Sequence, residues 1–427
     1  MPNSHNSRRD FIRKSSLVSS ATFAVPYISV SAQENNNKGN NPNLKIGLIG
    51  CGGRGSGAVI QALNADKNST LVAMCDIFPD RLQTAFKRIK TAMKGRVQID
   101  KTHLFSGFEG YKKLIEAVDV VLLASPPGFR PLHLAECAKA GRHVFCEKPV
   151  AVDMPGLRSV LDSANTLRKK NKSLVSGLCW RYDIGIQETI KRIQDGAIGK
   201  ILAIEATTMG GGMWQRPVND NMSQMEQQIR NWNKWQWLCG DIYLESHIHS
   251  LDMAAWVLGD IFPKNAWGMG GRQITRPDNW GNIFDHHHAR FDWGNGVMMT
   301  SSSRNQKGSI SHYDVHVIGT EGEAWTRTKR ISGKNGKWRY RGKPKNMYQE
   351  EHDRLFESIR KETPIDNSHY MCNSNKIALM GRAASYTGQL ITDKKIDMSM
   401  QSLAPKSYEF GDHKAHPIPI PGVTKLI

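Results

Sequence analysis

The sequence predicts an α/β fold with two domains: a doubly wound parallel sheet, then an α/β domain with a largely antiparallel, open sheet. Between residues 44 and 180, short apolar runs typical of buried strands alternate with runs of helical periodicity, as in βαβ units. After residue 181, strand-like runs are grouped together, and Asn295-Gly296 between two of them is typical of a hairpin turn. We therefore expect domains at residues 44–180 and 181–427.

The N-terminal residues resemble a twin-arginine export signal. Arg8 and Arg9 precede a moderately apolar stretch that is too short to span a bilayer, and small residues suited to cleavage end at Ala32. We expect residues 1–32 to be a signal peptide and the Asn-rich residues 33–43 to be a flexible linker. The sequence therefore predicts a periplasmic protein.

The composition argues against several classes of protein. The 427 residues are 39% hydrophobic, and no run approaches the roughly 20 apolar residues that a membrane span needs. The net charge of +19 is scattered and forms no basic stripe interleaved with aromatic residues, which argues against nucleic acid as a partner. The 7 cysteines show no C-x-x-C spacing, and in a strand His286, His287 and His288 would alternate between faces. We expect no metal site.

A glycine-rich turn follows the first apolar run directly. The strand expected at residues 44–49 is followed by G-x-G-x-x-G and by a helix-compatible run from about Ala58, which is the context of a dinucleotide site. A second strand expected at residues 69–75 ends at Asp76, placed to bind the hydroxyls of the adenosine ribose. No arginine follows directly to receive a 2′-phosphate, so NAD is favoured over NADP. The residues of this turn that we expect to bind the cofactor are Gly50, Cys51, Gly52, Gly53, Arg54 and Gly55.

The alternation of strands and helices then continues to the end of the first domain. We expect two strand ends to reach the cofactor, one at Ser125-Pro126-Pro127 and one at Glu147-Lys148-Pro149, because ligands bind at the carboxyl ends of parallel strands. The expected helices are 80–92, 111–117, 133–140 and 156–170, and the expected strands are 118–124, 143–146 and 173–179.

The second domain is predicted as a group of strands with helices before and after it. We interpret the Lys- and Arg-rich residues 327–345 as an exposed loop. The expected helices are 184–195, 350–361 and 375–390, and the expected strands are 200–208, 266–274, 286–292, 297–303, 314–318 and 323–328.

Residues 240–256 carry an E-x-x-x-H-x-x-D pattern. On one helix, Glu245 and His249 would be neighbours four residues apart, with Asp252 on the same face and His247 facing away. Oxidation of an alcohol needs a base for the hydroxyl proton, and Lys148 at a strand end could hydrogen-bond the same hydroxyl. The alternative is that His249 is a core histidine with its hydrogen bonds satisfied.

Three motifs in order resemble the Gfo/Idh/MocA family: the glycine loop, Glu147-Lys148-Pro149 and the E-x-x-x-H-x-x-D segment. The resemblance covers nearly the whole chain after the linker. It implies a Rossmann domain, an open sheet that mediates homo-oligomerisation, and catalytic roles for Lys148 and His249. Glu245 stands where the family usually has Asp, and Pro127 replaces a commoner Asn. Glu245 is then a third catalytic candidate, which contacts substrate or orients His249.

The resemblance also implies further contacts. Arg181-Tyr182 resembles the family's segment beside the nicotinamide, and the tryptophans at 214, 232, 235 and 237 suit the apolar faces of sugar rings or cover the sheet. Besides the glycine turn, the cofactor-binding candidates are Asp76, Ser125, Pro126, Glu147, Lys148 and Arg181, and the substrate-binding candidates are Tyr182, Trp237, Tyr243 and Asp252.

We predict an oxidoreductase that acts on a hydroxyl of a sugar, glycoside or polyol. Because exported protein meets no nucleotide pool, NAD is expected to stay bound and to be recycled within one catalytic cycle. The alternatives are an NAD-dependent glycoside hydrolase or lyase that forms a transient keto-sugar, and a non-catalytic sugar- or redox-sensing binding protein. The sequence carries only a faint echo of the Tyr-Pro-Thr-His-Gly segment of such glycosidases, and the pair Lys148 and His249 argues against a mere binder.

Overall fold

The first sheet of the computed structural model is the parallel sheet that the sequence predicts. Its strand order, β3-β2-β1-β4-β5-β6, is that of a doubly wound sheet, and every strand pairs in parallel with its neighbours. The short strand β3 is one that the sequence pattern did not predict. The strands are β1 (Leu44–Ile49), β2 (Ser69–Asp76), β3 (Leu104–Ser106), β4 (Val120–Leu123), β5 (His143–Cys146) and β6 (Leu174–Ser176).

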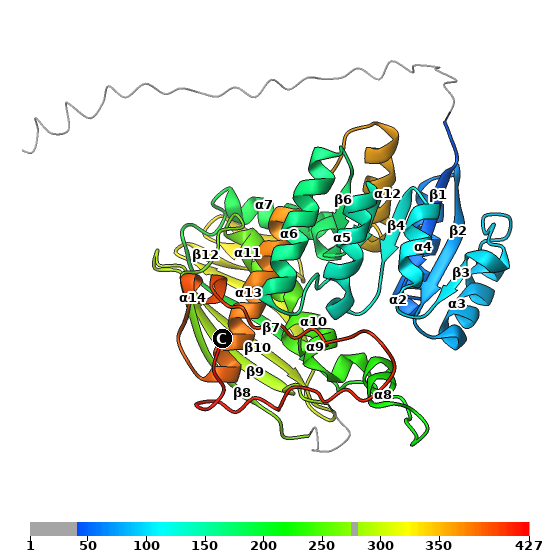
Figure 1. Cartoon of the computed structure of the whole chain (residues 1–427). Helices are drawn as coiled ribbons and strands as arrows, with labels where there is room; N and C mark the ends of the chain where they lie inside the picture. The colour runs from blue at the N-terminus through cyan, green and yellow to red at the C-terminus, as the bar shows by residue number, and fades with distance from the viewer. Residues whose placement is uncertain (1–40, 275–280, 427) are drawn as a thin grey trace, which may run out of the picture. The chain divides into compact units, whose positions relative to one another are not determined.

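Helices cover both faces of this sheet (Figure 1). Apolar residues of the strands alternate between two cores, with Leu48 in one and Ile49 in the other. The first helix starts at Gly53, directly on the glycine turn and earlier than expected. The helices are α2 (Gly53–Ala65), α3 (Pro79–Ala92), α4 (Gly110–Ala117), α5 (Arg130–Ala140) and α6 (Met154–Lys169).

The second sheet has nine strands in the order β14-β13-β12-β11-β7-β10-β9-β8-β15. Only β7 and β10 pair in parallel, so the predicted largely antiparallel sheet is confirmed. The strands are β7 (Ile201–Gly210), β8 (Asn265–Gly271), β9 (His286–Asp292), β10 (Met298–Asn305), β11 (His312–Gly319), β12 (Gly322–Trp325), β13 (Arg330–Gly333), β14 (Gly336–Arg339) and β15 (Ile391–Thr392).

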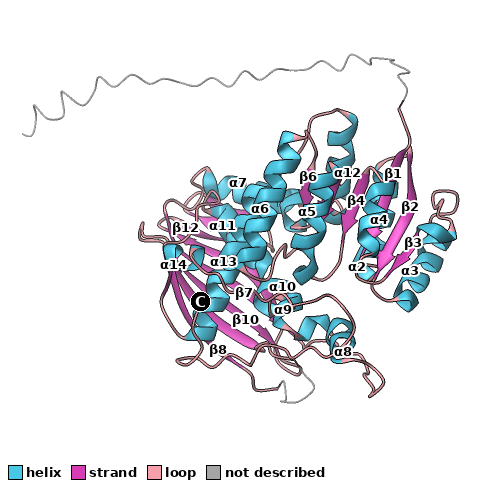
Figure 2. Ribbon diagram, viewed as in Figure 1, coloured by secondary structure: helices cyan, strands magenta, loops and turns pink. Residues whose placement is uncertain are grey.

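Helices cover one face of the nine-stranded sheet (Figure 2). Helix α11 packs on β7 and β11, and α13 packs on β8 and β9. Other strand residues, including Leu202, Trp267 and Met269, remain exposed. Along β9 the burial alternates, with His287 buried and His288 exposed, as expected for a strand. The remaining helices of this part are α7 (Ile184–Gln194), α8 (Gln224–Arg230), α9 (Gln236–Cys239), α10 (Ile242–Glu245), α11 (Ile248–Val257), α12 (Met347–Arg360), α13 (Ser368–Thr387) and α14 (Asp393–Asp397).

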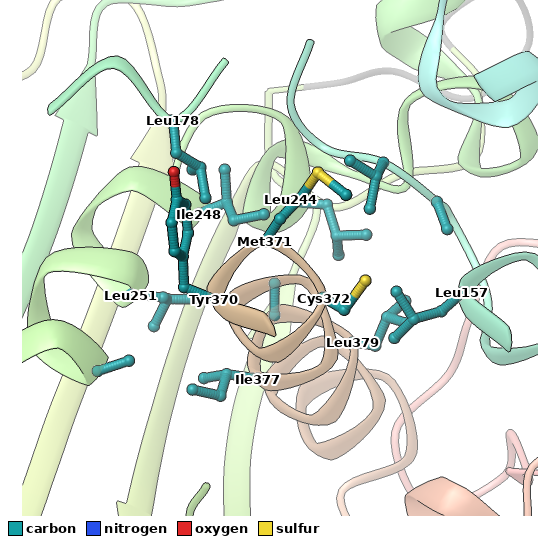
Figure 3. Close-up of a cluster of buried hydrophobic side chains, with 14 of the residues drawn as sticks. Leu157, Leu178, Leu244, Ile248, Leu251, Tyr370, Met371, Cys372, Ile377 and Leu379 are labelled. Atoms are coloured by element: carbon teal, nitrogen blue, oxygen red, sulfur yellow. The ribbon is translucent and has the colours of Figure 1, made fainter. Parts of the chain in front are cut away.

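Two late helices return to the first sheet, so packing crosses the boundary expected at residue 180. Helix α12 packs on α2, and α13 contacts both α6 and β6. Helix α13 starts before the expected residue 375 and is buried along most of its length, with Leu157 of α6 and Leu251 of α11 packed around it (Figure 3). Residues 42–427 accordingly form one unit.

Two local predictions were wrong. Residues 327–345 do not form an exposed loop, because strands β13 and β14 form a hairpin there and extend the sheet. The helix expected through residues 240–256 is broken between α10 and α11. At this break the ring of His247 contacts the Thr208 and Ser301 hydroxyls at 2.9 and 2.7 Å and so points to the sheet.

The structure describes residues 41–274 and 281–426. The predicted signal peptide, residues 1–32, and most of the predicted linker lie outside this range. Among the residues described, no helix combines the length and the apolar character that a membrane crossing requires.

Candidate active site

A cavity of about 460 Å³ lies at the carboxyl ends of the parallel strands and extends to α10 and α11. It brings together the glycine turn, the strand ends and the E-x-x-x-H segment, which lie far apart in the sequence. The predicted site residues on its wall are Gly50, Gly52, Gly53, Arg54, Gly55, Asp76, Ser125, Pro126, Glu147, Lys148, Glu245 and His249.

The glycine turn has the geometry of a dinucleotide-binding loop. Gly50 has φ +95°, and a Cβ there would lie 2.4 Å from the Ser125 nitrogen. A Cβ on Gly55 would lie 2.1 Å from the Gly50 carbonyl oxygen, so the helix packs closely on the turn. A Cβ added at Gly52 or Gly53 would meet no atom within 4 Å, and both glycines line the cavity.

Asp76 at the end of β2 is fixed beside this turn. Its carboxylate accepts hydrogen bonds from the backbone N–H of Cys51 at 2.8 Å and of Phe78 at 2.9 Å. Cys51 itself is not on the cavity wall, because its thiol is buried and donates to the Cys75 carbonyl. Cys51 therefore acts through its backbone, which holds the carboxylate in place.

These residues fit NAD. The open space above Gly52 and Gly53 leaves room for a pyrophosphate at the N-terminus of α2, where no side chain caps the helix. Asp76 lies where it would bind the adenosine ribose hydroxyls. Ser125 lines the cavity and its hydroxyl lies 3.0 Å from Nδ1 of His133, which orients it. The observed cradle, and not the motif alone, therefore supports a dinucleotide.

Lys148 and His249 both line this cavity. The Lys148 ammonium donates to the backbone carbonyl of Glu245 and lies 3.4 Å from Oε1 of its side chain. Helix α10 thus ends against Lys148, and α11 begins three residues later and places His249 on the same wall. Glu245 ends α10 and His249 lies in α11, so the two residues line one cavity although they are on different helices.

His249 is partly buried, and its Nδ1, which is itself buried, has no hydrogen-bond partner among the residues described. Burial and the nearby charge of Lys148 hold the pKa of His249 well below its usual value. The imidazole is therefore neutral at neutral pH and can accept a proton or a hydrogen bond from a ligand. Its unpartnered nitrogen does not fit the alternative of a satisfied core histidine.

Arg54 and Glu147 line the cavity but are engaged with each other. The Arg54 guanidinium donates to Glu147 and, at 2.7 Å, to the fully buried Glu351 of α12. Burial and the charge of Glu147 raise the pKa of Glu351 well above its usual range. The guanidinium of Arg54 is therefore held by hydrogen bonds within the protein.

Besides Cys51, five predicted residues do not reach the cavity wall. Arg181, expected beside the nicotinamide, is held by Asp252 and Asp260 and packs its guanidinium over Trp256. The four expected substrate contacts are instead buried or hydrogen-bonded within the protein. Tyr182 donates to Asn367, Trp237 donates to Gln228, Tyr243 bonds Ser301, and Asp252 accepts from Arg181 and Ser374.

Arg181→Met is expected to destabilise the fold by about 3–5 kcal/mol, because it leaves the buried Asp252 carboxylate without its cation. The exposed pair of Lys191 and Asp195 provides a control, since Asp195→Ala should cost less than about 1 kcal/mol. Urea unfolding measures both. Unchanged stability together with a lost affinity for NAD would restore the cofactor role predicted from the sequence.

The structure adds cavity residues that sequence reasoning did not assign to the site. The tryptophan cluster was a signal for Trp214 and Trp232, which do line the cavity, whereas no local pattern marked the others. These residues are Arg81, Arg130, His133, Trp214, Trp232, Tyr348 and Tyr408.

Comparisons with known proteins agree with this architecture. Residues 44–176 match the model of the GFO/IDH/MocA oxidoreductase family with an NAD-binding Rossmann fold, and residues 186–325 match a GFO/IDH/MocA C-terminal domain. The crystal structure of aldose–aldose oxidoreductase from Caulobacter crescentus, complexed with glycerol, superposes with a TM-score of 0.64 at 19% identity. The superposition covers 82% of this chain and 99% of that chain, and it shows a shared fold.

Two curated relatives share part of the sequence. A 2,7-anhydro-N-acetylneuraminate hydratase of Escherichia coli (strain K12) is 27% identical over 205 residues, 48% of this chain and 50% of the relative. A myo-inositol 2-dehydrogenase of Thermotoga maritima is 26% identical over 219 residues, 51% of this chain and 55% of the relative. The chain thus spans about half the length of these relatives. Both family models, in the expected order, show that the chain belongs to the Gfo/Idh/MocA family of oxidoreductases, with an NAD-binding Rossmann fold at its N-terminal side.

Proposed function

We propose that the protein is an NAD-dependent oxidoreductase that acts on a hydroxyl group of a sugar, glycoside or polyol. The observation that carries the proposal is the cavity in which Lys148 and His249 share a wall with the glycine turn. Such a cavity holds a dinucleotide and a small alcohol side by side. The names of the inositol dehydrogenase and aldose–aldose oxidoreductase relatives agree with this substrate class.

The residues would divide the reaction between them. The Lys148 ammonium would hydrogen-bond the hydroxyl oxygen and stabilise the negative charge that develops as the proton leaves. The neutral His249 would accept that proton. Glu245 would hold Lys148 in place through its backbone carbonyl and its carboxylate. NAD, when bound, supplies the acceptor for the hydride from the alcohol carbon.

The C-terminal segment at residues 403–416, here called the C-terminal strap, supports a retained cofactor. Tyr408 lines the cavity, and the Phe410 ring lies 5.0 Å from the Phe108 ring and 5.9 Å from the Phe78 ring. The strap runs past α8, whose Met225 backbone N–H donates to the Gly411 carbonyl and whose Gln228 side-chain amide donates to the His413 carbonyl (Figure 1). Because Phe78 follows Asp76, the strap covers the end of the cavity where adenosine would lie, and it would slow the release of NAD.

The double variant Tyr408→Ala/Phe410→Ala is expected to release NAD about tenfold faster, because each lost aromatic contact is worth about 0.5–1.5 kcal/mol. The release rate is measured by the fluorescence of bound NADH after addition of excess NAD. Val423→Ala, an exposed position farther along the same tail, is the matched control. An unchanged release rate in the double variant would show that the strap does not retain the cofactor.

We propose export to the periplasm by the twin-arginine route, on the pattern around Arg8 and Arg9. Replacement of both arginines by lysine should leave the protein in the cytoplasmic fraction of the cell. Periplasmic recovery of that variant would contradict the proposal.

We also propose a homo-oligomer that forms through the open face of the nine-stranded sheet. Trp267 and Met269 of β8 and Leu202 of β7 are exposed apolar residues on this sheet. Met269→Lys should lower the mass of the oligomer measured by light scattering. An unchanged mass would show that the subunits do not contact each other through this face.

The fate of a chromogenic glycoside tests the proposed function. A ketone product with reduced cofactor supports the oxidoreductase. Released aglycone without net NADH supports a hydrolase or lyase that works through a transient keto-sugar, a class consistent with the hydratase relative. Thermal stabilisation by sugar without either product supports a binding protein and overturns the proposal.

A further inference from the structure

Arg130 is a buried cation on the wall of the same cavity. It opens α5, its residue is only 5% exposed, and it lines the cavity together with Lys148 and Glu245. One of its terminal nitrogens donates to the carbonyl of Pro149, the residue after Lys148. Its Nε is buried and has no hydrogen-bond acceptor among the residues described.

Among the residues described, this guanidinium has no ion-pair partner, unlike those of Arg181 and the partly buried Arg54. The buried Arg382 also lacks an ion pair, but it lies outside this cavity and donates to the Gly240 carbonyl. Arg181 is paired with Asp252 and Asp260, and Arg54 is paired with Glu147 and Glu351. Within residues 41–274 and 281–426, no carboxylate lies within 4.0 Å of Arg130. An unpaired buried charge is costly, so this position favours a ligand that brings a negative group.

The position of Arg130 indicates which end of the cavity this ligand occupies. Its guanidinium donates to the Pro149 carbonyl, and the neighbouring Lys148 contacts Glu245, so Arg130 lies on the side of the cavity that this lysine forms. The pyrophosphate of a dinucleotide would lie at Gly52 and Gly53, at the N-terminus of α2. The negative group therefore belongs to the molecule that meets Lys148.

We propose that Arg130 binds the carboxylate of an acidic sugar, so that the preferred substrates are sugar acids such as uronic acids. The planar guanidinium suits a carboxylate because two parallel N–H···O bonds can form. Its anchor at the Pro149 carbonyl holds that carboxylate close to Lys148, where the reacting hydroxyl lies. A neutral polyol would leave the buried charge without a counter-ion. The inference rests on the proposed function and specifies its substrate class.

The test compares sugars that differ only in the carboxylate: D-glucuronate with D-glucose, and D-galacturonate with D-galactose. With the NAD-loaded protein we expect the uronates to give the higher kcat/KM and the larger rise in Tm. In Arg130→Gln the ratio of kcat/KM for uronate over neutral sugar should fall about 10- to 100-fold, the loss expected for a hydrogen bond to a charged group. Arg130→Lys keeps the charge but lacks the two parallel N–H donors of the guanidinium. Its ratio of kcat/KM should lie between those of the unaltered protein and Arg130→Gln.

Three outcomes would overturn the inference. The first is that the unaltered protein shows no preference for uronates. The second is that Arg130→Gln leaves the preference unchanged. The third is a lower affinity for NAD in Arg130→Gln with an unchanged uronate ratio, which would assign Arg130 to the cofactor. Should Arg130→Gln not fold, the ratio is read from Arg130→Lys. Arg130-dependent stabilisation by uronate without any ketone product would refute the proposed oxidoreductase and still support the acidic ligand.

Discussion

Lys148→Met is expected to lower the rate of sugar-hydroxyl oxidation in a single turnover by about 10²- to 10³-fold, the usual loss when one donor to a developing oxyanion is removed. The ammonium of Lys148 is held by the Glu245 carbonyl and lies on the wall shared with His249. Methionine keeps the length of the side chain and removes the charge that would stabilise the developing alkoxide. The measurement is the single-turnover rate of NADH formation with NAD already bound.

The controls separate this effect from a loss of cofactor or of fold. Lys139→Met removes an exposed lysine of α5 and should leave the rate unchanged. The NAD content of Lys148→Met should equal that of the unaltered protein. His249→Asn should lose activity in the same range, and the double variant should lose little more, because groups that act as a unit are not additive. If the single-turnover rate of Lys148→Met falls by less than about tenfold, Lys148 does not take part in the reaction.

Gly52→Val is expected to lower the affinity for NAD by about 10- to 100-fold, because a side chain there fills the space for the pyrophosphate and blocks charge-assisted hydrogen bonds. The fold should tolerate it, since Gly52 has φ −79° and its Cβ would meet no atom within 4 Å. Calorimetric titration of cofactor-free protein with NAD measures the loss.

Gly55→Val is the contrasting variant. A Cβ at Gly55 would lie 2.1 Å from the Gly50 carbonyl oxygen, so this change should lower the free energy of unfolding as well as the affinity for NAD. If Gly52→Val binds NAD as tightly as the unaltered protein does, the dinucleotide does not lie across the turn. The pair thus distinguishes a cofactor cradle from a glycine turn with only a structural role.

Local sequence patterns predicted the elements that neighbouring residues determine. Strands β5 and β9 have the expected bounds, and the glycine turn lies between β1 and α2 as expected. Apolar runs and a required turn conformation are properties of a few consecutive residues, and these survive whatever packs around them. One prediction failed at His247, which lies between α10 and α11 where the expected helix is broken and which bonds side chains of β7 and β10.

The residues predicted for the candidate site also fall into those that line the cavity and those that do not. Gly50, Asp76, Lys148 and His249 follow motifs, and all of them line the cavity. The expected ligands Trp237, Tyr243 and Asp252 have suitable chemistry and positions near the motif. These residues are nevertheless buried, and their polar atoms are hydrogen-bonded within the protein. Burial depends on which distant elements cover a residue.

The sequence by itself predicted the α/β class and the dinucleotide turn, because each is carried by residues close together in the chain, whereas Lys148 and His249 were assigned through the motifs that resemble the family. Only the tertiary structure decided that α12 and the C-terminal strap return to the Rossmann domain, and that Arg130, on the cavity wall with Lys148, has no counter-ion among the described residues. Burial and charge pairing arise between residues that are hundreds of positions apart, and no local pattern encodes them.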